Sequence, residues 1–206
     1  MEILWVTPVL LAFAGYFIGS VPFGLILTRL TGAGDLRAIG SGSIGATNVL
    51  RTGRKGIALA TLVLDLLKGS AAICVAYAVS PDDAPLAGAA AVLGHLYPLW
   101  LKFRGGKGVA TLMGTTVALS WPMGVVYAVV WLGTLAAFRI SSLAGMLAAA
   151  SVSIAALLLG RDDLFPLGTA LGLLVVWRHR ENIQRLVSGT EPRVGSRTAP
   201  SREDGV

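Results

Sequence analysis

Seven apolar segments, joined by polar connections of which the first is long, dominate this chain of 206 residues. Only 14% of the residues are charged, whereas soluble domains contain about 25%. A helix needs about 20 mainly apolar residues to cross a bilayer. The sequence therefore predicts an all-α integral membrane protein with about seven transmembrane helices, placed by the apolar segments at residues 4–30, 56–80, 86–101, 109–120, 123–138, 142–160 and 164–177.

The basic residues fall on alternate connections between these segments. If the N-terminus is outside, 15 of the 17 Lys and Arg residues lie on the cytoplasmic side, with Arg29 at the inner end of the first apolar segment. The exceptions are Lys68, which lies within the second apolar segment, and Arg161. Cytoplasmic loops of membrane proteins are enriched in Lys and Arg. We therefore predict an external N-terminus and a cytoplasmic C-terminus. The net charge of +6 is then explained by the membrane, with no nucleic-acid partner.

Three polar stretches on the predicted cytoplasmic side combine basic residues with glycine or polar side chains: residues 40–51, 102–108 and 178–182. Glycine exposes backbone N–H groups, and Arg or Lys adds charged donors, so such stretches suit phosphate. If the topology is right, all three can form one anionic site. The first lacks Pro and Glu but retains Ile44 and Val49, and we expect a folded loop rather than a disordered one.

The second stretch is a glycine turn at 105–108 that leads into a predicted helix. Its spacing does not match a phosphate-binding Walker A loop. The free N–H groups at a helix N-terminus nevertheless favour phosphate. His95 precedes this turn and His179 lies in the third stretch, where a histidine can act as a base or as a donor.

Asp65 and Lys68 are charged residues inside the second apolar segment. They are three residues apart and therefore share one helical face. We interpret them as a mutually neutralising structural pair, with the alternative that they line the wall of a site. Cys74 lies in the same segment and is predicted to be buried. No Cys/His cluster has metal-ligand spacing, so no metal or cofactor is expected.

Taken together, these residues resemble the bacterial acyl-phosphate:glycerol-3-phosphate acyltransferases, and the resemblance covers nearly the whole chain. SGSIGATNVLR at 41–51 is similar to the first motif of that family. The stretch at 94–111 is similar to the second motif, and HRENIQRLVSGTE at 179–191 to the third. Ser43 stands where the family usually has asparagine.

The resemblance implies seven helices, an external N-terminus and a multi-pass location in the bacterial cytoplasmic (inner) membrane. It also implies transfer of an acyl group from acyl phosphate to the 1-hydroxyl of glycerol 3-phosphate, giving lysophosphatidic acid and phosphate. Both substrates and membrane lipids are the expected partners. The predicted catalytic residues are Ser41, Arg51, His95, His179 and Asn182, and the predicted substrate-binding residues are Gly45, Thr47, Asn48, Arg104, Gly105, Gly106, Lys107, Gly108, Arg185 and Glu191.

Two other classes of function use similar features. A small-anion transporter also lines its path with glycine-rich loops and buried charges, but it would need polar groups on both faces and broken helices. A non-catalytic lipid-binding scaffold needs only the basic loops, which leaves Asn48, Asn182 and both histidines unexplained. We predict one transmembrane acyltransferase domain at 1–189 and a flexible cytoplasmic tail at 190–206.

Overall fold

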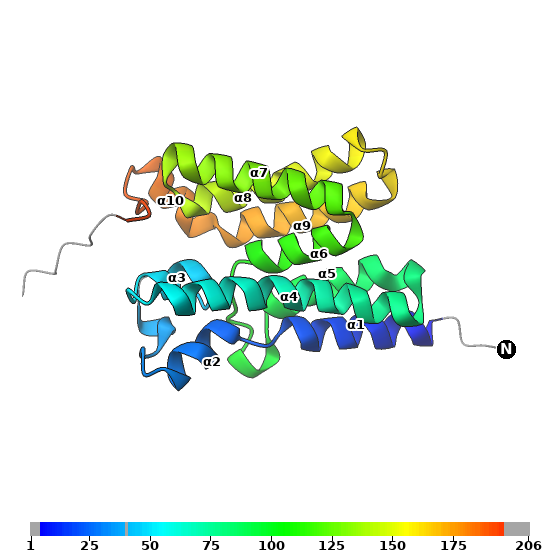
Figure 1. The fold of residues 1–206 in the computed structure, drawn as a ribbon, viewed down its shortest axis with the longest axis horizontal. Helices are drawn as coiled ribbons and strands as arrows, with labels where there is room; N and C mark the ends of the chain where they lie inside the picture. Colours follow the sequence, from blue (N-terminus) through cyan, green and yellow to red (C-terminus); the bar gives the residue numbers. More distant parts are fainter. Residues whose placement is uncertain (1–4, 40, 196–206) are drawn as a thin grey trace, which may run out of the picture.

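The fold is entirely helical over the residues that the structure describes, 5–39 and 41–195 (Figure 1). The structure is a computed structural model of the chain. Short 3-10 turns lie at Leu36–Ala38, Pro81–Asp83, Leu99–Leu101 and Asp162–Leu164. The α-helices are α1 (Val6–Gly19), α2 (Phe23–Leu30), α3 (Ala46–Leu50), α4 (Lys55–Val79), α5 (Ala84–Leu96), α6 (Val109–Leu119), α7 (Trp121–Phe138), α8 (Ser141–Leu158), α9 (Phe165–Arg178) and α10 (Arg180–Val187).

Five segments of the described chain are long and apolar enough to cross a membrane: Val6–Leu30, Lys55–Val79, Pro81–Leu101, Trp121–Phe138 and Ser141–Leu158. Helices α6 and α9 coincide with the two remaining apolar segments but are shorter, with 11 and 14 residues. The prediction of an all-helical architecture is therefore confirmed for the described residues.

The prediction of one continuous helix at 4–30 is wrong, because α1 and α2 are separate helices. Pro22 has no N–H group and disfavours helical backbone in the residue before it. A break within an apolar segment exposes carbonyl groups that need partners. The indole N–H of Trp100 donates a 2.9 Å hydrogen bond to the carbonyl of the residue that lies two positions before Pro22. Lys68 Nζ donates to the carbonyl of Val21, also at 2.9 Å. Side chains from two other segments thus stabilise the break.

The helices form two groups that are joined through α6 (Figure 1). Helices α1, α4 and α5 pack against one another in the first group, and α8 packs between α7 and α9 in the second. The larger core lies mainly in the second group, where it includes Tyr127 and Val175, and it extends to Leu112 of α6 and to the end of α5. A smaller core surrounds Ile73 in the first group. Both groups contribute helix ends to the same end of the molecule, where the candidate site lies.

Glycines allow close contacts between helices. A Cβ atom at Gly15 would lie 2.2 Å from the carbonyl oxygen of Ala87, and one at Gly19 would lie 2.0 Å from that of Ala91. The backbones of α1 and α5 therefore approach too closely for any side chain at these positions. The Gly168–Gly172 pair makes a similar, slightly looser contact between α9 and α8.

We expect Gly19→Ala to lower the thermal unfolding midpoint of the detergent-solubilised protein. The new methyl group meets backbone rather than a mobile side chain, so the destabilisation should lie near the upper end of overpacking effects, about 3 kcal/mol. Gly133→Ala is the matched control, because no atom lies within 4 Å of a Cβ there. Alanine is the better helix former, so this control should keep or raise the midpoint. Equal midpoints for the two variants would contradict the close contact.

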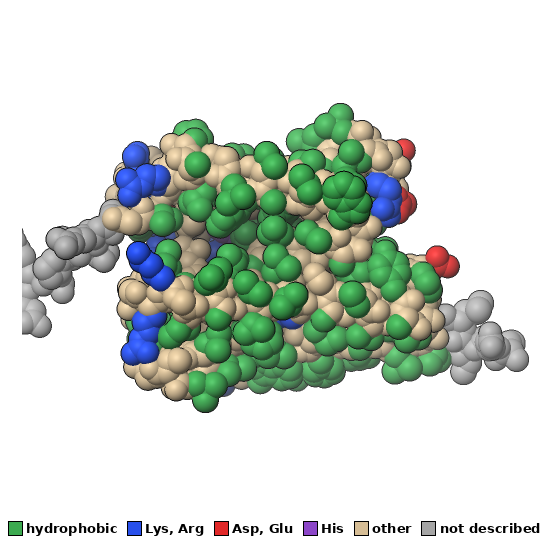
Figure 2. Space-filling model, in the orientation of Figure 1, with side chains coloured by type: hydrophobic (Ala, Val, Ile, Leu, Met, Phe, Trp, Pro, Cys, Tyr) green, Lys and Arg blue, Asp and Glu red, His purple; other side chains and the backbone are tan. Residues whose placement is uncertain are grey.

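Charge and apolar side chains are separated along the length of the molecule. Figure 2 shows apolar side chains along the helices, with Lys and Arg gathered at the end that carries α3 and α10. Acidic side chains are visible at the opposite end, beside further Lys or Arg atoms.

The prediction that Cys74 is buried is wrong, because this residue is exposed on the surface of α4.

The connection between α2 and α4 is folded, as predicted, over its described residues. Its residues Leu36, Ile44 and Val49 are buried in one cluster with Leu25 of α2 and Ala58 of α4. Burying these apolar side chains stabilises the loop against the two helices. The polar residues of the loop therefore hold fixed positions beside α4.

Candidate active site

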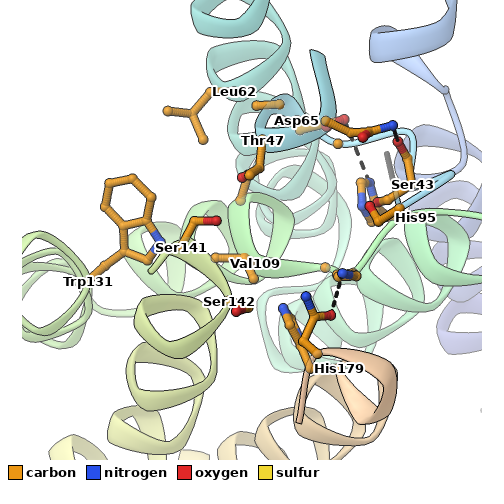
Figure 3. A pocket seen from close by; sticks show the side chains of 18 of the residues that line it. Ser43, Thr47, Leu62, Asp65, His95, Val109, Trp131, Ser141, Ser142 and His179 are labelled. Atoms are coloured by element: carbon orange, nitrogen blue, oxygen red, sulfur yellow. Dashed lines mark hydrogen bonds and ion pairs between the residues drawn. The ribbon is translucent and has the colours of Figure 1, made fainter. Parts of the chain in front are cut away.

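The three stretches singled out in the sequence meet around a cavity of about 100 Å³ (Figure 3). The first contributes the loop before α3 and α3 itself, the second the turn before α6, and the third the junction of α9 and α10. Residues of α4, α5, α7 and α8 complete the wall. The convergence predicted from the sequence is therefore confirmed in the part of the chain that is described.

Most of the predicted site residues line this cavity. Arg104, Gly105, Gly106 and Arg185 do not, and Arg104 is exposed to the surroundings instead. The predicted residues that do line it are Ser41, Gly45, Thr47, Asn48, Arg51, His95, Lys107, Gly108, His179, Asn182 and Glu191.

Asn48 holds the first loop in shape. Its side-chain nitrogen lies 2.9, 3.0 and 2.8 Å from the carbonyl oxygens of Leu36, Ile39 and Ser43, and the residue is almost fully buried. Its Oδ1 is buried without a hydrogen-bond partner among the described residues. Position 43 takes part through its backbone carbonyl, so this contact does not depend on whether serine or asparagine stands there. Only the Oδ1 atom of Asn48 remains for a ligand.

Three side chains of the same loop are available for binding. Ser41, Thr47 and Arg51 line the cavity, and none of them makes a side-chain hydrogen bond or ion pair to another described residue. Arg51 directly follows α3. A guanidinium group with free donors can bind a phosphate through two parallel hydrogen bonds, and hydroxyl groups can add further donors.

The glycine turn is packed tightly on His95. A Cβ atom at Gly105 would lie 2.1 Å from the carbonyl oxygen of His95, and one at Gly106 would lie 2.1 Å from its ring Nε2. Gly108 has a φ of 86°, a left-handed conformation that favours glycine, and it caps the N-terminus of α6. This geometry places Lys107 and the first two residues of α6 at the cavity wall.

A chain of short hydrogen bonds links Lys107 to the C-terminal part of the structure. Lys107 Nζ donates to Asn182 Oδ1, and Asn182 Nδ2 donates to Glu191 Oε1 at 2.6 Å. Ser142 also donates to Glu191 Oε1 at 2.6 Å, while Arg185 Nε donates to Oε2 at 2.7 Å. Asn182 is thereby oriented by two charged groups at once. Arg185 reaches the site only through Glu191.

The charges of Lys107 and Glu191 follow from their surroundings. Burial lowers the pKa of Lys107 to about 8, because the ammonium group loses hydration, although nearby Glu191 acts in the opposite direction. Burial acts to raise the pKa of Glu191, but hydrogen bonds from Ser142, Asn182 and Arg185 outweigh it, so the pKa is lowered. At neutral pH, Lys107 is therefore mostly a cation and Glu191 an anion.

His179 is buried and its tautomer is fixed. Its Nδ1 lies 2.8 Å from the carbonyl oxygen of Val175, which can only accept a hydrogen bond, so Nδ1 carries the proton. Burial lowers the pKa of His179 to about 4. The ring is therefore neutral at pH 7, and the lone pair on Nε2 is available to accept a proton or a hydrogen bond.

Several cavity residues lie outside the predicted set. Ser141, Ser142 and Trp131 line it from α8 and α7, and their sequence context carries no signal of a site. The predicted pair is confirmed, because Lys68 forms a 2.7 Å ion pair with Asp65. Of the two residues, Asp65 also lines the cavity and Lys68 does not. No three His, Cys, Asp or Glu side chains lie close enough to ligate a metal, within the described ranges.

The short tail segment that is described is fastened to the body. The N–H groups of Thr190 and Glu191 both donate to the carbonyl of Arg185, and Val194 exchanges hydrogen bonds with Arg139. Residues of the predicted flexible tail between 190 and 194 therefore make hydrogen bonds to the rest of the structure, and residues 196–206 lie outside the described residues.

Comparison with known proteins agrees with this site. Residues 9–189 match the model of a family described as glycerol-3-phosphate acyltransferase. A glycerol-3-phosphate acyltransferase from Cereibacter sphaeroides is 55% identical over 90% of this chain and 89% of its own length. One from Dinoroseobacter shibae is 53% identical over 96% of this chain and 99% of its own.

Solved structures of one protein share the fold. The crystal structure of PlsY (YgiH), an integral membrane glycerol 3-phosphate acyltransferase, in its glycerol 3-phosphate form, is 37% identical. The match covers 91% of this chain and 96% of that one, with a TM-score of 0.86. Its lysophosphatidic acid form gives a TM-score of 0.84 at 36% identity, covering 91% and 95% of the two chains.

These matches define a class of integral membrane acyltransferases, to which the helical fold and the polar cavity of this chain correspond. The chain belongs to the glycerol-3-phosphate acyltransferase family.

Proposed function

We propose that this protein transfers a fatty acyl group from acyl phosphate to the 1-hydroxyl of glycerol 3-phosphate, releasing lysophosphatidic acid and inorganic phosphate. The observation that carries the proposal is the meeting of Arg51, Lys107 and the N-terminus of α6 at one cavity. Two anionic substrates must be brought together there, which requires several cationic or N–H donors. No cofactor or metal is needed, because an acyl phosphate is already an activated mixed anhydride.

The two phosphate groups are assigned to different sides of the cavity. Arg51, with the hydroxyl groups of Ser41 and Thr47, binds the phosphate of glycerol 3-phosphate. Lys107 and the free N–H groups at the start of α6 bind the acyl phosphate. Apolar lining residues, Leu62 of α4 and Trp131 of α7, mark where the acyl chain leaves the polar site.

The reaction follows from this placement. The hydroxyl oxygen attacks the acyl carbonyl carbon, and the bond between that carbon and the phosphate oxygen breaks. The phosphate leaves with the electron pair of the broken bond, and the hydroxyl proton passes to His95, to His179 or to a substrate phosphate. Positioning and electrostatic stabilisation by fixed donors supply most of the rate.

The proposal includes the arrangement in the cell. We infer seven membrane crossings, with an external N-terminus and a cytoplasmic C-terminus, in the cytoplasmic membrane of a bacterium. Residues 1–189 form the one catalytic domain, and a tail follows it. The basic end of the molecule, which carries the cavity, then faces the cytoplasm, where both phosphorylated substrates are soluble or at the membrane surface.

A reconstitution assay tests the reaction and its donor. Purified protein should release phosphate in proportion to lysophosphatidate formed from acyl phosphate and glycerol 3-phosphate, and acyl-CoA or acyl carrier protein conjugates should not replace the donor. Uptake of phosphate into liposomes without product formation would instead indicate an anion transporter. The broken helix at α1–α2 is compatible with a transporter, but Trp100 and Lys68 occupy the exposed carbonyl groups there.

A further inference from the structure

Asp65 and Lys68 form a buried charged pair in the middle of the fold. Their side chains are only 4% and 2% exposed, and Lys68 Nζ lies 2.7 Å from Asp65 Oδ1. Charged side chains within a membrane segment are costly and generally mark a functional site. An apolar pair of similar volume would fill the same space, although it would leave the carbonyl of Val21 without the ammonium donor. The pair therefore calls for a role beyond filling space.

Lys68 connects the pair to the break between α1 and α2. Its ammonium group donates to the carbonyl of Val21 at 2.9 Å and lies 5.8 Å from the centre of the Phe23 ring. These contacts leave little freedom for the ammonium group. Asp65, which is bound to it, is fixed in turn.

Asp65 faces the active site on its other side. It lines the cavity, and its Oδ1 lies 3.7 Å from Nδ1 of His95 (Figure 3). That nitrogen is buried without a hydrogen-bond partner among the described residues. The separation exceeds a hydrogen bond, but a movement of about 1 Å would close it, and catalytic hydrogen bonds are often long before substrate binds. Asp65 is the carboxylate placed to accept a hydrogen bond from the N–H group at this Nδ1.

The opposite edge of the imidazole is confined by the glycine turn. Nε2 of His95 sits against the Cα atom of Gly106, where a Cβ would approach to 2.1 Å. Lys107 follows directly and points into the same cavity. The imidazole ring of His95 thus lies between a carboxylate near Nδ1 and the glycine turn near Nε2.

We propose that Asp65 is a positioning residue for His95: it holds the imidazole with the proton on Nδ1, so that the lone pair of Nε2 faces the substrates beside Lys107. Lys68 keeps the carboxylate charged and in place. This inference rests on the proposed function and deepens it, because it selects the state in which His95 can accept a hydrogen bond or the hydroxyl proton. Such orienting carboxylates fix the tautomer of catalytic histidines.

The charge-neutral double variant Asp65→Asn/Lys68→Met tests the role. It removes the pair as a unit and leaves no uncompensated charge. We expect the variant to fold with a thermal unfolding midpoint lower by about 5 °C, because it also removes the hydrogen bond from Lys68 to the Val21 carbonyl, a kcat lower by about tenfold to a hundredfold, and little change in KM. Parental kcat would overturn the proposal. A collapse of the folded state would also overturn it, because the pair would then act in the fold.

Coupling to His95 gives the second comparison. If Asp65 acts through His95, then the double variant combined with His95→Gln should have the same kcat as His95→Gln alone. Multiplied effects would show that the two residues act separately and would contradict the proposal. Asp163→Asn is the matched control, because it removes a carboxylate from an exposed ion pair with Arg161 that does not line the cavity, and parental kcat is expected.

A spectroscopic measurement separates this inference from the proposed function. With ¹⁵N-labelled histidine and His179→Gln, only the His95 imidazole gives a signal. We expect the Nδ1–H tautomer in the presence of the Asp65–Lys68 pair and a mixture of tautomers in the charge-neutral double variant. The same spectrum in both would reject the role of Asp65, whether or not acyl phosphate proves to be the donor.

Discussion

Arg51→Ala is expected to reduce kcat/KM for glycerol 3-phosphate by about a hundredfold to a thousandfold, the loss typical when a preorganised donor for a developing or bound anion is removed. The guanidinium lines the cavity and makes no side-chain hydrogen bond or ion pair to another described residue, so its donors are free for phosphate. Because it supports no other side chain, the variant should insert and extract like the parent. Steady-state kinetics with each substrate varied, together with size-exclusion profiles, measure both expectations.

Lys55→Ala is the control for Arg51. It removes the same charge four residues further along, at the exposed start of α4 and away from the cavity, so kcat/KM should stay within about twofold of the parent. Arg51→Lys should recover only part of the loss, since an ammonium group cannot form two parallel hydrogen bonds to one phosphate. Equal losses in Arg51→Ala and Lys55→Ala would mean that Arg51 contributes only general positive charge.

The sequence predicts the helical segments and the meeting of the three polar stretches for one physical reason. A bilayer requires long apolar helices, and the alternation of charge then assigns each connection to a side. Stretches that are distant in the chain, such as 41–51 and 179–191, must therefore lie at the same end of the molecule. Their convergence follows from topology, without any knowledge of side-chain packing.

The roles of individual side chains depend on packing that sequence patterns do not encode. Asn48 has a polar side chain that could contact a substrate, but its side-chain nitrogen donates to backbone carbonyl oxygens of its own loop, three of which lie within hydrogen-bond distance. Arg104 and Arg185 have the right charge but do not line the cavity. Ser142 enters the site only because α8 begins opposite Glu191. Composition indicates which residues can bind an anion, and the folded chain decides which of them face it.

The break between α1 and α2 illustrates a different limit. Hydropathy alone favours one helix at 4–30, and Pro22 is the local signal against it. Whether a membrane helix tolerates such a proline depends on whether other segments satisfy the freed carbonyl groups. Lys68 and Trp100 do so here. A charged residue that the sequence assigns to a neutralising pair thus also supports a neighbouring helix.

Lys107→Met should reduce kcat/KM for acyl phosphate by about a hundredfold to a thousandfold, because the variant removes the ammonium group at the turn before α6.

Asn182→Ala tests the position of the Lys107 ammonium group separately from its charge. It leaves the ammonium group in place but removes the acceptor that orients it and the amide that donates to Glu191. We expect most activity to be lost in this variant as well, while insertion and extraction stay normal. Near-parental turnover in either variant would remove that residue from the site.

The pH dependence gives Lys107 a distinctive signature. Burial lowers its pKa to about 8, so the cation is fully present below this value and is lost as the pH rises through it. The parental kcat/KM should therefore fall about tenfold per unit above pH 8, since this parameter reports ionisation of the free enzyme. The second ionisation of a substrate phosphate lies near 6 and cannot produce this decline.

Lys107→Arg keeps its charge throughout this range, so whatever activity it retains should show no decline between pH 8 and 10. A decline that persists in Lys107→Arg would assign the titration to another group and leave Lys107 without a role as the cation that binds acyl phosphate.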